Sequence, residues 1–273
     1  MFKLFFSDDV WQFGTVIAKE SYSAWSSTLT LTLCAWLLLV AVIAYLLGAV
    51  NTAIILTKFV YREDIRKKGS GNAGMTNVMR NYGWGPAVIT LFGDMLKCMF
   101  AMMVGTALLG INGAYVAGLM CVVGHVAPVY YKFKGGKGVA AMFMFILYIN
   151  FWAFIIIGLL FILLVWASRY LSLGSIMSAF IMPLVLERFD WYGIIEPIRV
   201  LASLTVMLIV VYKHRANIGR IWNKTESRFS FKRTAKKAEI TAAEAAPEQS
   251  PELDEETKKR KEENRKKSAK KKK

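Results

Sequence analysis

A polar, glycine-rich stretch at residues 67–80 has the composition of an anion-binding loop. Gly69, Gly71 and Gly74 would let a ligand approach the backbone closely. The stretch ends on Arg80, whose planar guanidinium suits phosphate oxygens. Neutral hydrogen-bonding side chains stand among these residues: Ser70, Asn72, Thr76 and Asn77. The glycine spacing also fits a dinucleotide fingerprint, but no predicted strand precedes it. An ordinary basic loop between membrane spans is the alternative interpretation.

A second candidate stretch runs from His125 to Gly138. Its three glycines are Gly135, Gly136 and Gly138, and Lys137 stands among them. Exposed backbone N–H groups and a mobile ammonium favour phosphate. The pattern is not a P-loop, because Gly-x-x-x-x-Gly-Lys-Ser/Thr fails at both ends. A lysine-rich turn is again the alternative, which three glycines within four residues make weaker.

Two smaller polar groups follow. Ser172 and Ser175 open an apolar run, where hydroxyl residues more often mediate helix packing. His214 and Asn217 are three residues apart, so a continued helix would place them on one face. A lone histidine at a membrane edge is usually an interfacial polar residue. Asp94 and Lys97 lie within an apolar run, where we favour a buried structural ion pair over a functional one.

The composition indicates that membrane-spanning helices position these residues. The chain has 273 residues, 55% of them hydrophobic, and a net charge of +16. Its mean hydropathy of +0.39 argues against an ordinary soluble enzyme. A membrane helix needs roughly 20 mainly apolar residues. We interpret seven apolar runs as transmembrane helices: Leu31–Thr57, Gly83–Leu109, Ala114–Tyr131, Gly138–Ile149, Phe151–Ala167, Leu171–Leu186 and Ile194–Tyr212. The fourth is the shortest and weakest, and a re-entrant or tilted segment is the alternative for it.

The loop charges predict the orientation of these spans. Lysine and arginine concentrate in 58–82, 132–137, 168–170 and from 213 onward, and these segments face one side if there are seven spans. The positive-inside rule places that side in the cytoplasm and the N-terminus outside. We expect three parts: an N-terminal extension (1–29), a membrane domain (30–229) and a disordered charged cytoplasmic tail (230–273). For the extension, an interfacial helix and a frayed terminus are the two alternatives.

The cysteines do not suggest a metal centre. Cys34, Cys98 and Cys121 lie in apolar runs without C-x-x-C spacing, and their number is odd. The expected role is that of buried small side chains, with no zinc site and no disulfide framework.

Several motifs in order resemble one enzyme family. Gly69-Ser70-Gly71-Asn72-x-Gly74-x-Thr76-Asn77-x-x-Arg80 is similar to the first signature of the bacterial acyl-phosphate:glycerol-3-phosphate acyltransferases, the PlsY type. Gly124-His125-x-x-Pro128 through Val139-Ala140 resembles the second, and Arg169-Tyr170-x-Ser172-Leu173-x-Ser175-Ile176 the third. His214-Arg215-x-Asn217-Ile218 and Asp94-x-x-Lys97 also recur in the family. The similarity covers residues 40 to 229. Met75 and Ala141 depart from the family pattern, where alanine and threonine are usual.

The resemblance implies an all-α integral membrane enzyme with seven transmembrane helices and an active site facing the cytoplasm. It would transfer a fatty acyl group from acyl phosphate to the 1-hydroxyl of sn-glycerol 3-phosphate, giving lysophosphatidic acid and phosphate, the first step of phospholipid synthesis. We expect a monomeric cell-membrane protein that needs no cofactor or metal and binds no nucleic acid. The expected catalytic residues are Ser70, Arg80, Lys137, Ser175, His214 and Asn217. The expected substrate-binding residues are Gly69, Gly71, Asn72, Gly74, Thr76, Asn77, His125, Gly135, Gly136, Gly138 and Ser172.

The residues fit this chemistry, because both substrates carry phosphate and the acyl donor is an amphiphile that needs a site open to lipid. Two other classes remain as alternatives. A carrier for phosphorylated anions would place polar sites near the bilayer midplane and show internal repeats. A membrane anchor that acts through its basic tail would explain the tail but not the glycine motifs.

Overall fold

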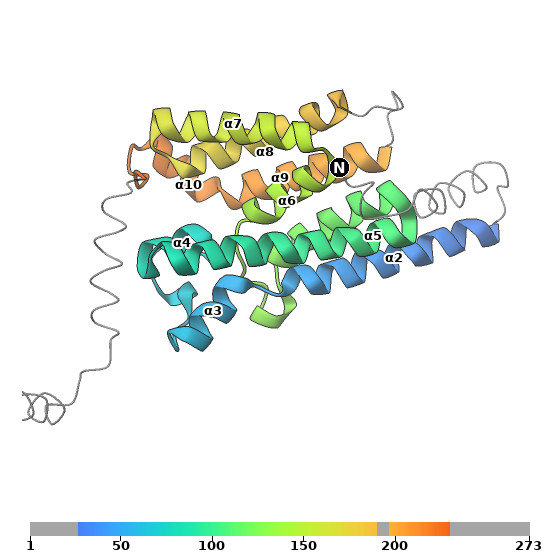
Figure 1. The fold of residues 1–273 in the computed structure, drawn as a ribbon, viewed down its shortest axis with the longest axis horizontal. Helices are drawn as coiled ribbons and strands as arrows, with labels where there is room; N and C mark the ends of the chain where they lie inside the picture. The colour runs from blue at the N-terminus through green and yellow to red at the C-terminus, as the bar shows by residue number, and fades with distance from the viewer. Residues whose placement is uncertain (1–26, 190–196, 230–273) are drawn as a thin grey trace, which may run out of the picture.

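The computed structural model describes residues 27–189 and 197–229, and within these ranges all regular structure is helical. The predicted all-α class is therefore confirmed for the described part of the chain (Figure 1). Residues 1–26, the whole tail (230–273) and residues 190–196, which include the first three residues of the last predicted span, lie outside it. The helices are α2 (Ser27–Ala49), α3 (Thr52–Val60), α4 (Met75–Tyr82), α5 (Trp84–Val126), α6 (Val139–Ile149), α7 (Phe151–Ser168), α8 (Leu171–Arg188), α9 (Pro197–Lys213) and α10 (Arg215–Trp222), with single turns η2 (Ile65–Lys67) and η3 (Val129–Tyr131).

The first apolar run is continuous in hydropathy but not in helix. It breaks after α2, and α3 begins at Thr52 with Asn51 as its N-cap. The Asn51 side-chain oxygen accepts from the Ile54 N–H at 3.0 Å, which satisfies one of the free donors at the helix start. The amide nitrogen of Asn51 donates to the Ala73 carbonyl at 3.2 Å. The break thus joins the first span to the glycine loop that follows α3.

Helix α5 contains two predicted spans in one hairpin. Its backbone leaves the helical region at Leu109 and Gly110, where Gly110 has a φ of 59°. The second half then returns beside the first, as Figure 1 shows. Gly105 and Gly113 make the close approach possible, because a Cβ on Gly113 would lie 2.1 Å from the Gly105 carbonyl oxygen. Small residues at such a crossing let helices pack without a hydrophobic driving force in lipid.

The lengths and apolar character of the helices support a membrane protein but do not establish that there are seven spans. Four segments of the described chain are long and apolar enough to cross a bilayer, and the bent pair α9 and α10 adds a fifth. One of the four, Trp84–Tyr131, has 48 residues and includes the hairpin. Helix α6 has only 11 residues, which matches the expectation that the fourth run is the shortest.

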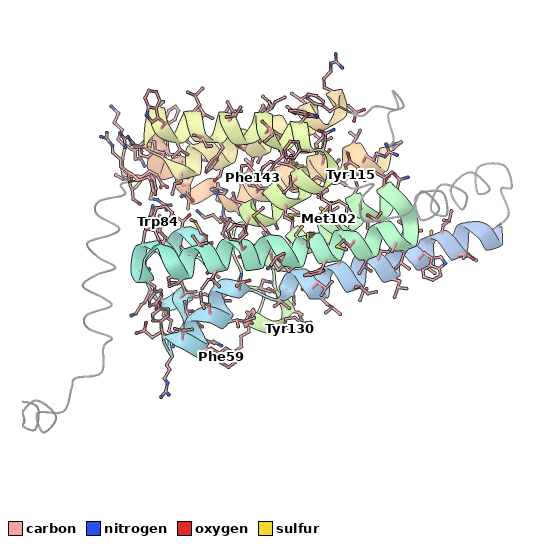
Figure 2. The ribbon with its side chains drawn as sticks, viewed as in Figure 1. Phe59, Trp84, Met102, Tyr115, Tyr130 and Phe143 are labelled. Carbon is pink, nitrogen blue, oxygen red and sulfur yellow. The ribbon has the colours of Figure 1, made fainter. Side chains whose placement is uncertain are left out.

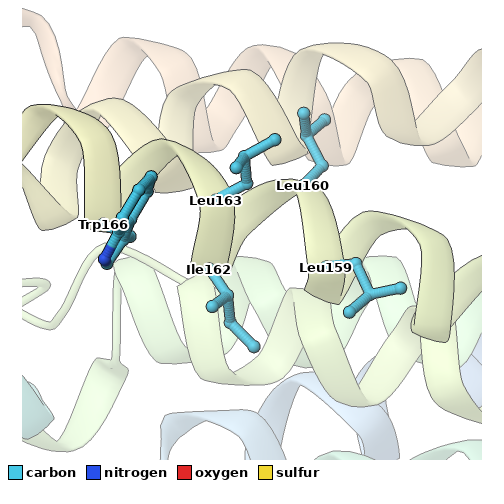
Figure 3. A pocket seen from close by; sticks show the side chains of 5 residues that line it. All are labelled: Leu159, Leu160, Ile162, Leu163 and Trp166. Atoms are coloured by element: carbon cyan, nitrogen blue, oxygen red, sulfur yellow. The ribbon is translucent and has the colours of Figure 1, made fainter.

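The outer surface of the bundle is apolar. Helix α7 is the most exposed of the long helices, and its side chains line a shallow hollow of about 460 Å³ on its outward face (Figure 3). The hollow is lined by Leu159, Leu160, Ile162, Leu163 and Trp166. It carries no charged group that could hold a phosphate, so it is part of the surface that lipid chains would cover.

The core lies between α2, α5, α6, α8 and α9. Met102, Tyr115 and Phe143 of this region are marked in Figure 2, and the Tyr115 ring meets Phe145 edge to face at 5.5 Å. Cys98 and Cys121 are buried here, as expected. The prediction for Cys34 was wrong: this side chain is exposed on α2, because most of that helix faces outward along its length.

Candidate active site

Residues from the second and fourth motifs meet at one end of the bundle. The Lys137 ammonium donates to the Asn217 side-chain oxygen at 2.5 Å, although the two residues are 80 positions apart. Asn217 is buried on α10 and uses its amide nitrogen to donate to Glu226 at 2.7 Å. The tertiary structure therefore forms a chain of two hydrogen bonds, from the Lys137 ammonium through the Asn217 amide to the Glu226 carboxylate.

Glu226 is the centre of this cluster. One carboxylate oxygen accepts from Asn217 and from the Ser172 hydroxyl, the latter at 2.8 Å. The other oxygen pairs with the Arg220 guanidinium at 2.7 Å. The Glu226 side chain is almost completely buried, so these three donors replace the water that its charge would otherwise require. Glu226 fixes the positions of Ser172 and Asn217 relative to each other.

Burial and crowding of charge alter the acid–base properties of the cluster. Burial lowers the pKa of Lys137 to about 8; the Glu226 carboxylate opposes this shift, and Arg220 and Arg80 add to it. Burial also lowers the pKa of Arg80, which stays charged at neutral pH. Burial alone would raise the pKa of Glu226, but hydrogen bonds from Asn217, Ser172 and Arg220 hold it below its ordinary value. The site thus contains three cationic side chains and one carboxylate.

Arg80 is the cation that this network leaves open. It stands in the last turn of α4 and interacts electrostatically with Glu226 and Arg220. Across residues 27–189 and 197–229, its guanidinium donates no hydrogen bond and forms no salt bridge. A half-buried guanidinium without a partner is well suited to receive an anionic ligand.

His214 stands at the junction of α9 and α10. The helix does not continue straight, as the three-residue spacing assumed, because the two helices are bent by 54°. The His214 Nδ1 lies 2.8 Å from the Val210 carbonyl oxygen, so Nδ1 carries the hydrogen. In the neutral ring this leaves Nε2 as an acceptor. His214 is buried, and its ring interacts electrostatically with Lys137. His214 therefore belongs to the same cluster.

The first glycine loop is held in shape by Asn77. Its amide nitrogen donates to the carbonyls of Ile65, Lys68 and Asn72 at 3.0–3.1 Å. Its oxygen accepts from the Ser70 backbone N–H at 3.0 Å. The structure therefore gives this predicted ligand a scaffold position with its hydrogen-bonding capacity used. Gly69 and Gly71 have φ of 56° and 71°, which only glycine adopts without strain.

The other residues of the first motif surround this scaffold. Gly74 caps α4, and Thr76 lies in its first turn. Ser70 is exposed, and none of the hydrogen bonds among the described residues joins it to Lys137, Asn217 or Glu226. The structure brings Arg80 to the cluster but leaves Ser70 outside its hydrogen-bond network.

The second glycine loop packs directly on the first. The Gly136 N–H donates to the His125 carbonyl at 3.1 Å. A Cβ on Gly136 would lie 2.1 Å from His125 Nε2 and 2.6 Å from the Ala73 carbonyl oxygen. Gly135 is equally tight against the His125 carbonyl, and Gly138 has a φ of 85°. These glycines are needed for close packing, and the turn that they form presents Lys137.

A buried charge cluster lies beneath both loops. The Lys97 ammonium donates to the Val50 carbonyl at 2.6 Å, pairs with Asp94 at 2.9 Å and lies 3.0 Å from His125 Nδ1. Asp94, Lys97 and His125 are all buried, and the expected ion pair is present. The break in the first span frees the Val50 carbonyl, and Lys97 satisfies it. His125 was predicted to bind substrate; in the structure it is buried and supports Gly136 from below.

Ser175 differs from Ser172 in its surroundings. It is buried one turn further along α8, and its hydroxyl donates to the Leu171 carbonyl of its own helix at 2.9 Å. The bond to a backbone carbonyl uses the hydroxyl hydrogen and leaves the oxygen lone pairs available as acceptors.

The sequence motifs did not identify Glu226, Arg220 or Asn51. Glu226 carried a possible signal, because it is the only acidic residue between 213 and 229, a segment rich in basic side chains. A single carboxylate among cations near a proposed phosphate site could have been predicted to organise them. Asn51 gave no comparable signal, since nothing in a continuous apolar run predicts the break.

The chain is similar to known proteins over most of this region. Residues 38–224 match the family model described as glycerol-3-phosphate acyltransferase. The glycerol-3-phosphate acyltransferase of Finegoldia magna is 37% identical over 197 residues, which cover 71% of this chain and 96% of that protein. The protein of the same name from Syntrophotalea carbinolica is 40% identical over 188 residues, covering 68% of this chain and 94% of that one.

Two solved structures share the fold. A structure of PlsY (YgiH), an integral membrane glycerol 3-phosphate acyltransferase in its glycerol 3-phosphate form, matches with a TM-score of 0.64 and 30% identity over 71% of this chain and 96% of that chain. The lysophosphatidic acid form matches with a TM-score of 0.65 and 28% identity, covering 73% and 98%. The motifs, the helical membrane architecture and these similarities agree, and the chain belongs to the PlsY-type glycerol-3-phosphate acyltransferase family.

Proposed function

We propose that this protein transfers a fatty acyl group from acyl phosphate to the 1-hydroxyl of sn-glycerol 3-phosphate, with lysophosphatidic acid and phosphate as products. The observation that carries the proposal is the cationic cluster of Arg80, Lys137 and Arg220 around one carboxylate, with Arg80 left open. Both proposed substrates are phosphate anions, so such a cluster matches what they share. The solved relatives were captured with glycerol 3-phosphate and lysophosphatidic acid, which are one substrate and one product of this reaction.

In the proposed reaction, the glycerol 1-hydroxyl oxygen attacks the acyl carbonyl carbon, and the bond from that carbon to the phosphate oxygen breaks. The departing phosphate takes the electron pair, and the hydroxyl proton passes to a phosphate oxygen of a substrate. Acyl phosphate is an activated mixed anhydride, so positioning and charge stabilisation can supply most of the catalysis. No protein nucleophile or cofactor is required.

The side chains divide this work. Arg80 and Lys137 neutralise phosphate and polarise the carbonyl, while Ser70, Ser175 and Asn217 orient the reactants. His214 holds glycerol phosphate, and its Nε2 is able to accept a hydroxyl hydrogen. The proposed substrate-binding set is Gly69, Gly71, Asn72, Gly74, Thr76, Asn77, His125, Gly135, Gly136, Gly138 and Ser172. Within it, Asn77 and His125 act through the loops that they support.

For the topology, we propose seven spans, counting each half of α5 and the short α6 as one span apiece. The N-terminus is then outside, and the site and C-terminus face the cytoplasm of the cell membrane. Residues 30–229 form the catalytic domain of a monomer, with 1–29 as an extension and 230–273 as a charged tail. The basic residues of the proposed cytoplasmic loops support this orientation.

The carrier alternative has less support. A carrier would use open polar sites deep in the bundle. The deep polar cluster here is Asp94, Lys97 and His125, whose groups are bonded to one another and to the Val50 carbonyl. These groups therefore already have partners within the protein, whereas Arg80, whose guanidinium has no hydrogen bond or salt bridge among the described residues, lies at the end of the bundle.

A turnover assay tests the function. Purified protein in lipid vesicles receives a long-chain acyl phosphate and glycerol 3-phosphate, and inorganic phosphate and lysophosphatidate are followed together. We expect both products in equal amounts, with Arg80→Ala and Lys137→Ala each reducing kcat/KM by at least about a hundredfold. Lys67→Ala and Arg188→Ala remove matched charges elsewhere and should leave turnover unchanged. Wild-type protein without turnover, or full activity in both site variants, would refute the proposal; uptake of glycerol phosphate without acylation would favour a carrier.

A further inference from the structure

A surface of exposed aromatic and lysine side chains lies next to the second glycine loop, and the proposed reaction does not use it. It is formed by the last turn of α3 and by the loop around η3. Phe59, Tyr130 and Phe133 are 83%, 54% and 63% exposed. Figure 2 shows Phe59 and Tyr130 on the same side of the molecule, away from the core. With the exposed Lys58, Lys132 and Lys134, they make up what we term the aromatic–lysine surface.

The two segments of this surface are tied together. The Arg66 guanidinium donates to the Tyr131 carbonyl at 2.9 Å and to the Lys134 carbonyl at 3.4 Å. The Lys58 ammonium lies 5.8 Å from the centre of the Tyr131 ring, in cation–π contact. The η3 loop is thus bonded to η2, which follows α3 in the chain, and Lys58 of α3 contacts it directly.

The backbone presents Phe133 at a conformational cost. Lys132 and Phe133 have φ of 56° and 58°, which non-glycine residues rarely adopt. Two such residues in succession persist only where the surroundings hold them, and such strain tends to be found where function requires it. Here it directs a large aromatic side chain outward, three positions before Gly136.

The lysines of the surface are not neutralised by direct ion pairs, although Lys58 interacts with Asp64 at longer range. The nearby acids are already engaged, since Asp64 pairs with Arg66 at 2.7 Å and Glu63 with Lys68 at 2.6 Å. Over the described ranges 27–189 and 197–229, Lys58, Lys132 and Lys134 form no salt bridge. The surface therefore offers three positive charges to an anionic partner.

The position of the surface indicates that this partner is lipid. Phe59 belongs to the continuous apolar segment Leu31–Val60, so the surface adjoins a membrane span. Aromatic rings beside lysines at the end of a span are typical anchors at the membrane–water interface. Each basic side chain near an anionic leaflet strengthens association by about fivefold.

We propose that the aromatic–lysine surface binds anionic phospholipid headgroups of the cytoplasmic leaflet and that this contact holds the loop carrying Lys137 at the membrane surface, where the amphiphilic acyl donor lies. The proposal rests on the orientation and reaction proposed above. The surface and the loop are rigidly connected, because Lys134 is three residues before Lys137 and the intervening Gly136 is hydrogen-bonded to His125. Turnover should therefore rise with the anionic fraction of the bilayer.

A fluorescence experiment locates the surface without relying on turnover. In a Cys34→Ser background, an environment-sensitive dye is attached at Phe133→Cys, with Lys224→Cys as an exposed control at the same end of the molecule. In vesicles containing anionic lipid, we expect quenchers near the lipid headgroups to act on the dye at 133 and aqueous iodide to act on the control. A dye at 133 that iodide quenches fully would place the surface in water, available to a soluble acidic partner, and would overturn the proposal.

A charge-removal series, measured by turnover, tests the link between lipid binding and activity. Wild-type protein is compared in zwitterionic vesicles and in vesicles of rising anionic phospholipid content. We expect turnover to increase at least about threefold with anionic lipid, and we expect the triple variant Lys58→Gln, Lys132→Gln, Lys134→Gln to keep zwitterionic turnover but lose the increase. The matched triple variant Lys67→Gln, Lys224→Gln, Arg228→Gln should retain it. Equal responses in both triple variants would refute the site, while absence of turnover in every lipid would instead refute the proposed reaction.

Discussion

The chain of hydrogen bonds from Lys137 through Asn217 to Glu226 predicts how activity responds to alkaline pH. Lys137 can neutralise phosphate only while protonated, and its pKa is about 8. The profile of kcat/KM against pH, which reports the free enzyme, should therefore fall on the alkaline side with a midpoint near that value. Removing the negative charge of Glu226 takes away a stabilising partner of the ammonium, so Glu226→Gln should move the midpoint to lower pH.

The size of the shift follows from the geometry. Two hydrogen bonds and one amide separate the ammonium from the carboxylate, a distance of roughly 6 Å. At an effective dielectric constant of 20 to 40, the attraction is about 1.5–3 kcal/mol. Partial exposure of Lys137 favours the lower figure, which corresponds to about one pH unit. The midpoint should move from about 8 to about 7.

The assay compares wild type, Glu226→Gln and Glu63→Gln between pH 5.5 and 9.5, in roughly half-unit steps. Glutamine keeps an acceptor for Ser172 and Asn217, so the fold should survive, and thermal unfolding checks this. Glu63→Gln removes a carboxylate that pairs with Lys68 and should leave the profile unchanged. An alkaline midpoint that stays in place or moves upward in Glu226→Gln would refute the electrostatic coupling.

Three further substitutions test the packing beneath the site. Gly136→Ala should raise the KM for glycerol 3-phosphate by at least about tenfold, because its Cβ would collide with His125; an unchanged KM would show that the loop can shift. Gly113→Ala should lower the midpoint of thermal unfolding in detergent by several degrees, since its Cβ would meet the Gly105 carbonyl; an unaltered midpoint would contradict the tight hairpin. Lys97→Met should destabilise the protein by about 3–5 kcal/mol, measured by denaturant unfolding, because a buried carboxylate and carbonyl lose their donor; a loss below about 1 kcal/mol would indicate that water replaces it.

Several residues that the sequence predicted for the site are neighbours in the structure. Arg80, Lys137, His214 and Asn217 were identified from their types and neighbours, and the structure gathers them into one cluster. Asn77 and His125 were identified as well, but their side chains support the loops instead of facing the open cation. Residue type alone does not distinguish a polar group that binds a ligand from one that satisfies a buried backbone.

Hydropathy by itself determined that the chain is helical and apolar, because a lipid environment requires every backbone polar group to be paired within its own segment. The motifs by themselves indicated phosphate chemistry, because few residue types can hold that anion. The turn at Gly110 falls at the boundary between the second and third predicted runs, so the sequence indicated it. The break at Asn51 and the engagement of Glu226 were decided only by tertiary structure. Asn51 bonds to Ala73, 22 positions away, and Glu226 to Ser172, 54 positions away, and one-dimensional patterns do not record such partners.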